Sequence, residues 1–345
     1  MAARFAPVAI SCFIFASASI AKAQDTIPPP FPAPGRLVDV GGWRLHLNCT
    51  GNGNASQPTV ILEAGIGDFS VEWGLVQPEV ARFARVCSYD RAGDGWSELG
   101  PHPRTLRQIV YELHTLLAKA GEQPPFVLVG HSFGGWPIRV YASTYPSDVA
   151  GIVLVEGGWD NPWRKLRERG LVRSAELATG QPVPEVKTAG PVRLSDIQGN
   201  IRAQILAGVE QLRRNPNEPP RDRLSADAQR MRAWALGRMG HIIAGVNPFL
   251  EEELALLRAE REKNEKVYGD LPLVVITRRL SDAGGPDSEE LLAERIKEHA
   301  TLAALSRRGK HVVAERSGHH VQIEQPELVI ESIREVVRAA RRDGH

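Results

Sequence analysis

Cysteine and net charge are both scarce in this sequence, and each shortage excludes a class of function. The 345 residues include only three cysteines, and no histidine pair has a metal-ligand spacing such as H-E-x-x-H. The sequence therefore predicts no metal and no other cofactor. The 42 Lys and Arg residues nearly equal the 41 Asp and Glu residues, which gives a formal net charge of +1. That balance argues against a nucleic acid or an anionic membrane as a partner held by charge.

Long hydrophobic runs are also missing, apart from one near the N-terminus. Residues 5–20 are apolar and uncharged, and Ala21-Lys22-Ala23 then forms an A-x-A cleavage signature. The run is shorter than the roughly 20 residues that a membrane-spanning helix needs. We therefore expect residues 1–23 to be a signal peptide, cleaved between Ala23 and Gln24. This predicts a periplasmic or extracellular protein without a stable membrane anchor.

The most informative motif is a serine between two glycines, directly after an apolar run. Residues 126–129 are typical of a buried strand, residues 130–134 read G-H-S-F-G, and a helical pattern follows. A serine at such a strand-to-helix turn adopts a strained backbone, which small residues on either side make possible. The turn exposes the Ser132 hydroxyl and places the Phe133 N–H at the positive end of a helix. We interpret Ser132 as a nucleophile. The alternative is a capping serine at a glycine-rich helix start.

A loop near the C-terminus carries a candidate base. Residues 310–314 predict a short strand, and Pro326 is typical of the first turn of a helix. Two histidines, His319 and His320, lie on the loop between them. A histidine on such a loop is free to face a cleft.

Taken together, these motifs resemble the α/β-hydrolase family. The pattern G-H-x-x-x-x-E-Q-P at residues 318–326 is similar to the way many members present their catalytic histidine, and it selects His319 over His320. Residues 63–67 (E-A-G-I-G), which we call the oxyanion loop, resemble the family's loop of that name. Residues 88–97 resemble its Y-D-x-x-G-x-G-x-S turn. The resemblance implies a mostly parallel eight-stranded sheet flanked by helices, with an inserted helical cap.

The same resemblance implies an oxyanion hole and a catalytic acid. The backbone N–H groups of Ile66 and Phe133 are the expected oxyanion donors. Two carboxylates satisfy the order serine, acid, histidine. Asp282 lies on the loop after a predicted strand at residues 272–277, where most members carry the acid, although the usual glycine is missing there. Glu156 lies at the end of the sixth strand, where a minority carry it.

The sequence divides into a core and an insertion. Strand-like runs alternate with helical patterns over residues 37–159 and 270–345, which predicts a core with crossover helices. Residues 160–269 show no strand signal, and helical periodicity recurs at residues 197–212 and 226–257. We interpret this segment as a helical cap, because such lids exclude water and shape a substrate pocket. A proline-rich leader at residues 24–36 is expected to be an extended tether.

Helix boundaries can be predicted within the core. Apolar residues recur at helical spacing from Leu106 to Leu117, with Thr105 as a cap and Gly121 as a stop. Further helices are expected around residues 289–305 and from 326 to about 341.

Export changes the interpretation of the cysteines. Removal of the signal peptide leaves Cys49 and Cys87, and an isolated pair in an oxidising compartment is a disulfide candidate. In the strand order that the resemblance implies, these cysteines lie on neighbouring strands. The alternative is two buried free thiols.

These features predict a serine hydrolase that cleaves an ester of a small, apolar molecule through an acyl-enzyme. An amidase, a lactonase or a carbon–carbon bond hydrolase would use the same residues. A member that only binds an apolar ligand under the cap is the alternative from another class. The sequence leaves the oligomeric state open.

Overall fold

The computed structural model describes residues 28–52, 57–166, 170–190, 217–245, 247–281 and 289–342. Eight strands form one sheet in the spatial order β1-β2-β4-β3-β5-β6-β9-β10. β2 runs antiparallel to β1 and β4, and the other neighbouring pairs are parallel. The predicted eight-stranded, mostly parallel sheet is therefore confirmed. The strands are β1 (Arg36–Asp39), β2 (Arg44–Thr50), β3 (Thr59–Glu63), β4 (Val86–Tyr89), β5 (Phe126–His131), β6 (Val149–Val155), β9 (Leu273–Arg278) and β10 (Gly309–Ala314).

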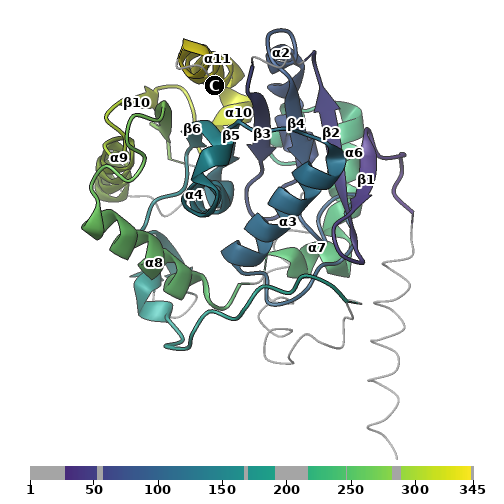
Figure 1. The fold of residues 1–345 in the computed structure, drawn as a ribbon, viewed down its shortest axis with the longest axis horizontal. Helices are drawn as coiled ribbons and strands as arrows, with labels where there is room; N and C mark the ends of the chain where they lie inside the picture. The colour runs from purple at the N-terminus through teal and green to yellow at the C-terminus, as the bar shows by residue number, and fades with distance from the viewer. Residues whose placement is uncertain are drawn as a thin grey trace, which may run out of the picture.

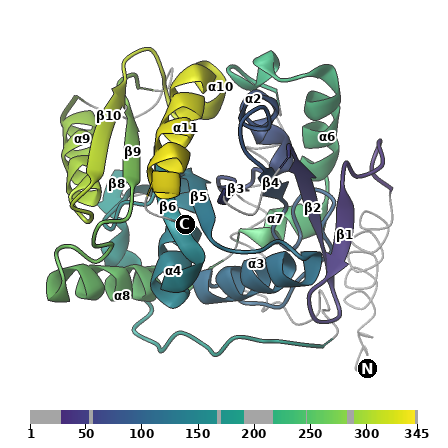
Figure 2. The ribbon, with the colours of Figure 1, turned by 45° about the horizontal axis from the view of Figure 1, so that its top comes forward.

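Helices cover both faces of this sheet (Figures 1 and 2). The central strands β3, β5, β6 and β9 are buried along their whole length, as expected for parallel strands between two helical layers. One apolar core joins the sheet to α3, α4 and α9, and a second joins its other face to α2 and α11. These helices are α2 (Gln77–Val80), α3 (Leu106–Ala120), α4 (Gly135–Thr144), α9 (Glu289–Ala303) and α11 (Pro326–Arg342).

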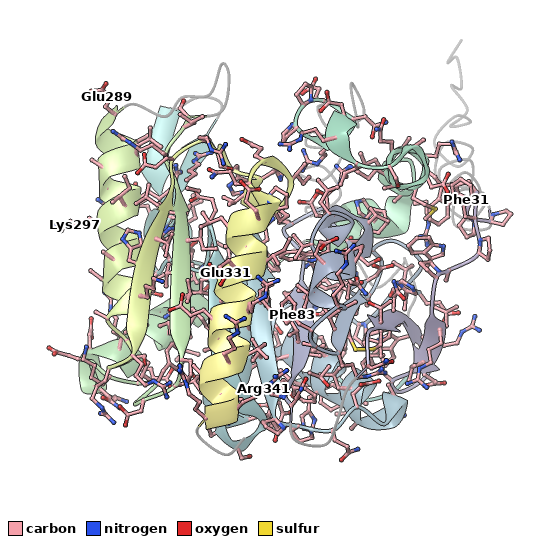
Figure 3. The ribbon with its side chains drawn as sticks, turned by 90° about the horizontal axis from the view of Figure 1, so that it is seen from above. Phe31, Phe83, Glu289, Lys297, Glu331 and Arg341 are labelled. Carbon is pink, nitrogen blue, oxygen red and sulfur yellow. A yellow bond between two sulfur atoms is a disulfide. The ribbon has the colours of Figure 1, made fainter. Side chains whose placement is uncertain are left out.

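The predicted helix boundaries in the core are confirmed. The Thr105 side chain accepts a hydrogen bond from the Gln108 N–H at the start of α3, and Gly121 ends the helix with a φ of 77°. α11 begins at Pro326, and Figure 3 shows Phe83 beside this helix. There the Arg334 guanidinium lies 4.5 Å from the centre of the Phe83 ring.

The insertion differs in two ways from its prediction. A short antiparallel hairpin, β7 (Trp163–Leu166) and β8 (Gly170–Arg173), lies where no strand was predicted. Neither strand has the long apolar run of a core strand, because the two pair only with each other outside the main sheet.

The helix predicted for residues 226–257 is three helices in the structure. These are α6 (Ala226–Leu236), α7 (Met239–Ala244) and α8 (Leu250–Lys263). Glycine and proline interrupt helices, and both occur at these boundaries. Gly237 is the C-cap of α6, and Pro248 lies just before α8. The helix predicted for residues 197–212 lies outside the described residues.

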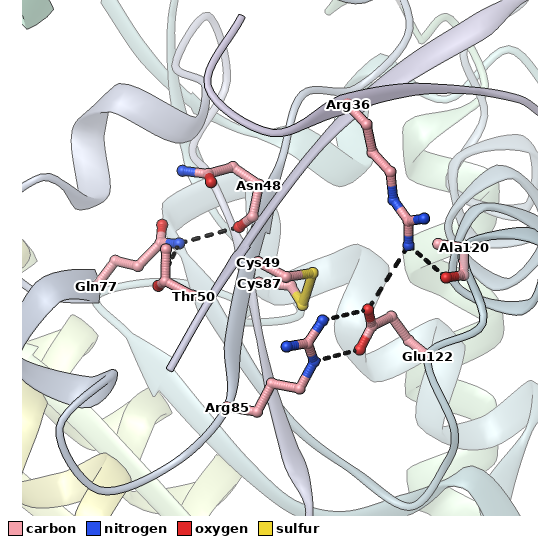
Figure 4. Close-up of a disulfide and its surroundings, with 9 residues drawn as sticks. All are labelled: Arg36, Asn48, Cys49, Thr50, Gln77, Arg85, Cys87, Ala120 and Glu122. Atoms are coloured by element: carbon pink, nitrogen blue, oxygen red, sulfur yellow. Dashed lines mark hydrogen bonds and ion pairs between the residues drawn. A yellow bond between two sulfur atoms is a disulfide. The ribbon is translucent and has the colours of Figure 1, made fainter. Parts of the chain in front are cut away.

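The Cys49–Cys87 disulfide joins neighbouring strands near one edge of the sheet (Figure 4). The two cysteines are directly opposite each other in the β2–β4 pair, with Cα atoms 4.0 Å apart. The predicted pairing is confirmed in the structure. The bond links positions 38 residues apart in the chain and so ties β2 to β4 covalently.

The described part of the leader lies against the core. The carbonyl oxygen of Phe31 accepts a hydrogen bond of 3.1 Å from the Trp96 indole, and Pro34 O lies 2.5 Å from His46 Nε2. Phe31 also packs in an apolar cluster with Phe69 and Met231, so this part of the expected extended tether is attached to the core. Residues 1–27, with the predicted signal peptide, lie outside the described residues. Among those described, no helix has the length and apolar character to cross a membrane.

Candidate active site

Ser132 lies at a sharp turn between β5 and α4. Its φ is 52°, a left-handed conformation that is unusual for any residue other than glycine. A Cβ atom on Gly130 would lie 2.5 Å from Gly134 O, and one on Gly134 would lie 2.6 Å from Glu63 O. The two glycines of the motif are therefore required by close backbone contacts. They allow a turn that presents the serine hydroxyl at the end of the sheet.

His319 approaches Ser132 from the loop between β10 and α10 (Val321–Glu324). Its Nε2 lies 2.9 Å from Ser132 Oγ, and its side chain is partly exposed. The His131 ring lies behind it, and His131 Nε2 lies 2.9 Å from the backbone oxygen of His319. Because a carbonyl only accepts, His131 donates its Nε2–H in this bond. His131 thus supports the backbone of His319.

Glu156 is the carboxylate that the described residues place beside His319. It is completely buried at the end of β6, and its Oε1 lies 3.9 Å from His319 Nδ1. Its φ of 48° is again left-handed, so the chain turns sharply at this residue. A Cβ atom on the next residue, Gly157, would lie 2.1 Å from Ser132 O. The turn after β6 therefore packs directly against the serine turn and brings Glu156 to the imidazole.

Positive groups around Glu156 keep it ionised. Its Oε2 accepts a hydrogen bond of 2.7 Å from the Arg278 N–H, and its Oε1 lies 3.3 Å from Arg278 Nε and 3.2 Å from Arg295 Nε. Burial by itself would raise the pKa of this carboxyl. The nearby His319 imidazole and the charges of His299 and Arg295 outweigh burial and lower the pKa of Glu156 to about 2. Glu156 is therefore a carboxylate at neutral pH.

Asp282, the other candidate acid, lies outside the described residues. The described part of its loop ends at Ser281, and Leu280 N donates a hydrogen bond of 3.0 Å to Ser317 O. This bond holds the start of the loop to the segment just before His319.

The oxyanion loop lies beside the serine turn and is held through its carbonyl groups. Arg91 Nη1 donates to Ala64 O at 2.7 Å, and Arg91 Nη2 donates to Gly65 O at 2.5 Å. The Arg91 guanidinium also lies over the Phe133 ring, 5.3 Å from its centre. Arg91 thus links the two segments that carry the predicted oxyanion donors, Ile66 and Phe133.

Asp68, His131 and His320 have possible metal-ligand atoms within 4.8 Å of one another. However, Asp68 Oδ1 already accepts hydrogen bonds from Arg221 at 3.1 Å and Arg232 at 3.0 Å. Two guanidinium groups beside the site repel a cation. The arrangement is better suited to an ion-pair network than to a metal, and the predicted absence of a metal stays a prediction.

An apolar cavity opens at Ser132. It has a volume of about 260 Å³. The insertion contributes to its wall, and so do the two segments that follow Ser132 and Glu156. The lining includes Ile66, Phe133, Trp136, Trp159, Pro162 and Leu250. The Trp136 indole donates a hydrogen bond of 2.8 Å to the backbone oxygen of Trp159, which holds the Trp136 side chain against that part of the chain. The cavity can hold a small apolar group next to the hydroxyl.

Several residues of the site were not singled out by sequence reasoning. Arg278 and Arg295 carry no local pattern that distinguishes them from the other arginines of the chain. His241 is buried, and no local pattern marks it either. The one available signal was the position of Arg91 inside the Y-D-x-x-G-x-G-x-S turn.

Two buried histidines predict that acid destabilises the fold. Burial lowers the pKa of His131 to about 3 and that of His299 to about 4, from an ordinary value of 6.5. Between the ordinary pKa of 6.5 and the lowered pKa in the folded protein, the unfolded chain binds protons that the folded chain does not. The free energy of unfolding therefore falls as the pH falls from about 6.5 to about 4. Each histidine contributes up to about 1.4 kcal/mol per pH unit. Urea unfolding at pH 7, 6 and 5 measures the slope, which should be shallower for His299→Gln. Equal slopes for the two proteins would contradict the prediction.

A family of known proteins matches most of the chain, and individual relatives match it over different lengths. The Alpha/beta hydrolase family matches residues 60–332. An AB hydrolase superfamily protein of Gibberella zeae is 25% identical over 298 residues, which cover 83% of this chain and 88% of that protein. A Schizosaccharomyces pombe protein described as uncharacterized is 33% identical over 154 residues, which cover 36% of this chain and only 29% of that protein. The solved structure of the epoxide hydrolase CorEH has a TM-score of 0.62 at 18% identity, with 87% of this chain and 97% of that chain covered.

Proposed function

Because the chain belongs to the alpha/beta hydrolase family, we propose that it is a serine hydrolase that cleaves a carboxylic ester. The observation that carries this proposal is the 2.9 Å contact between His319 Nε2 and Ser132 Oγ at a strained turn. A serine hydroxyl becomes a nucleophile when an adjacent base can take its proton. The apolar cavity beside Ser132 supports a small, apolar acyl or alcohol group as the part of the substrate that is bound.

The proposed reaction has two acyl-transfer steps. His319 removes the Ser132 proton as Oγ attacks the ester carbon, and then gives that proton to the departing alcohol. Water, deprotonated by His319, attacks the acyl-enzyme and releases the acid and free Ser132. In both steps the N–H groups of Ile66 and Phe133 stabilise the negative charge on the carbonyl oxygen.

Glu156 is the proposed third member of the triad. Its carboxylate stabilises the imidazolium that forms on His319 and orients the ring. The 3.9 Å between Glu156 Oε1 and His319 Nδ1 is longer than a catalytic hydrogen bond, and such bonds shorten when substrate binds. Asp282 is the alternative.

A serine nucleophile favours ester hydrolysis over the opening of an epoxide, for which this fold uses an aspartate. Amide, lactone and carbon–carbon bond substrates remain chemical alternatives, since all would react through the same Ser132 and His319. A purely binding role is less well supported, because nothing about apolar binding requires a histidine nitrogen at Ser132 Oγ. We also propose export to an oxidising compartment, a proposal that the Cys49–Cys87 disulfide supports.

The size of the cavity predicts a preference for short acyl chains. Drug-sized ligands occupy cavities of roughly 300–1,000 Å³, and the cavity at Ser132 is smaller, at about 260 Å³. We expect the kcat/KM for nitrophenyl acetate and butyrate to be at least about tenfold higher than that for nitrophenyl dodecanoate, because a long chain does not fit the cavity. A tenfold difference corresponds to about 1.4 kcal/mol of lost transition-state binding. Steady-state hydrolysis of this ester series tests both the function and the preference.

Leu250 offers a variant that should change this preference. Leu250→Ala removes part of the cavity wall and should raise the relative kcat/KM for longer chains. Leu256→Ala is the matched control, because Leu256 lies on the same helix, is half exposed and does not line this cavity. A protein that hydrolyses none of the esters would contradict the proposed function. An unchanged preference in Leu250→Ala would contradict only the role of the cavity.

A further inference from the structure

We propose that His241, acting together with Arg91, is a positioning residue for the oxyanion hole, so that the insertion fixes the geometry of the catalytic loop. This inference rests on the proposed function. It concerns a residue that lies in α7, far along the chain from both the oxyanion loop and Ser132.

Two groups from different parts of the chain hold the carbonyls of the oxyanion loop. Arg91, from the core, donates to Ala64 O and Gly65 O. His241, from the insertion, lies with Nε2 3.0 Å from Gly67 O. Since a carbonyl oxygen can only accept, His241 donates its Nε2–H there.

The hydrogen bonds to these carbonyls determine where the amides point. In a trans peptide the carbonyl and the following N–H point in opposite directions. Arg91, by holding Gly65 O, therefore turns the Ile66 N–H away from itself, and His241 fixes the far end of the same turn at Gly67. Among the described residues no hydrogen-bond acceptor is recorded for the Ile66 N–H. This leaves it available to an oxyanion.

Asp94 joins the two holding groups. Its Oδ1 lies 2.9 Å from His241 Nδ1, and its Oδ2 lies 3.2 Å from Arg91 Nη2. All three side chains are buried, with exposed fractions of 1–3%. Displacement of His241 would therefore shift Gly67 directly and would shift Arg91 through Asp94.

Close packing keeps α7 against the core. A Cβ atom on Gly93 would lie 2.7 Å from Gly240 O in α7, so the helix backbone sits directly on the turn that carries Asp94. A Cβ atom on Gly245, just after α7, would lie 2.9 Å from the Ile66 side chain. The insertion thus contacts the oxyanion loop at both Ile66 and Gly67. This packing fixes the position of His241 relative to the loop.

Two amide substitutions separate the contacts of His241. Gln places its amide nitrogen near the position of Nε2 and can keep the hydrogen bond to Gly67 O. Asn places its amide nitrogen near Nδ1 and keeps only the contact with Asp94. We expect His241→Asn to lower kcat for the best nitrophenyl ester between about 10-fold and 100-fold, with KM changed less than about threefold. His241→Gln should keep most of the wild-type kcat.

A transition-state analogue gives a readout that a merely structural role would not move. An alkyl boronic acid forms a tetrahedral adduct with an active serine, and its inhibition constant should rise in His241→Asn by about the factor by which kcat falls. The matched control is His114→Asn. His114 also faces a carboxylate, with Nε2 3.5 Å from Asp148 Oδ2, but it lies partly exposed and away from the site. It should leave both constants unchanged.

The outcomes distinguish this inference from the proposed function. Equal kcat in His241→Asn and His241→Gln would overturn the inference, and so would a lower kcat with unchanged boronate inhibition. If His241→Asn does not fold, as judged by its thermal unfolding, a His241→Gln protein with kcat and boronate inhibition both reduced more than tenfold would also overturn it. If wild type hydrolyses no ester and binds no boronate, the proposed function itself fails.

Discussion

Ser132→Ala is expected to abolish covalent labelling by a fluorophosphonate and to lower kcat by about 10³–10⁶-fold. The physical reason is that Ser132 Oγ lies 2.9 Å from His319 Nε2, and among the described residues it is the hydroxyl that contacts this nitrogen. The residual rate over water comes from the oxyanion donors and from binding alone. Gel fluorescence after labelling and steady-state hydrolysis of nitrophenyl acetate measure the two effects.

Ser147→Ala is the matched control for this substitution. Ser147 is exposed in the short helical turn after α4, where its hydroxyl contacts only Asp148 among the described residues. It should label and turn over like wild type. Wild-type hydrolysis by Ser132→Ala would remove the proposed nucleophile, and with it the acyl-enzyme mechanism.

Glu156→Gln is expected to lower kcat by about 10²–10⁴-fold, whereas Asp282→Asn should lower it less than about tenfold. A triad acid replaced by its amide leaves the histidine in the wrong tautomer and removes the charge that stabilises the imidazolium. Glu156 is suited to that role because it is buried, lies beside His319 Nδ1 and has its pKa lowered to about 2. The measurement is the full pH–rate profile of each variant with nitrophenyl acetate.

The two variants form a matched pair, since each replaces one carboxylate by the amide of equal length. Glu156→Gln also removes a buried negative charge from beside Arg278 and Arg295, which costs stability. Circular dichroism and thermal unfolding therefore accompany the kinetics, so that loss of turnover in a folded protein is separated from unfolding. The reverse ranking, with Asp282→Asn far slower than Glu156→Gln, would assign the acid to Asp282. Wild-type rates in both would reduce the site to a Ser132–His319 pair.

The sequence by itself determined the features that depend on neighbouring residues in the chain. The glycines around Ser132 predicted its turn, because Gly130 and Gly134 are close in the chain and a Cβ atom on Gly130 would lie only 2.5 Å from Gly134 O. Thr105 and Gly121 marked the ends of α3 because caps act within a single helical turn. Hydrophobic runs also predicted the central strands from neighbouring residues, because a strand that is buried on both faces is apolar throughout. The hairpin β7–β8 escaped prediction because neither Trp163–Leu166 nor Gly170–Arg173 is a continuous apolar run.

Tertiary structure decided the features that depend on charge and on distant contacts. The pKa of Glu156 follows from Arg295 on α9 and His299 one turn later, groups more than a hundred positions away that meet the carboxylate only when β6 and β9 pair. His241 contacts Gly67 across 174 positions. No local pattern encodes such contacts, because the energy of an ion pair or a buried hydrogen bond depends on distance and burial, and these exist only in the folded chain. For this reason the sequence could name two candidate acids, while only the packed sheet placed Glu156 beside His319.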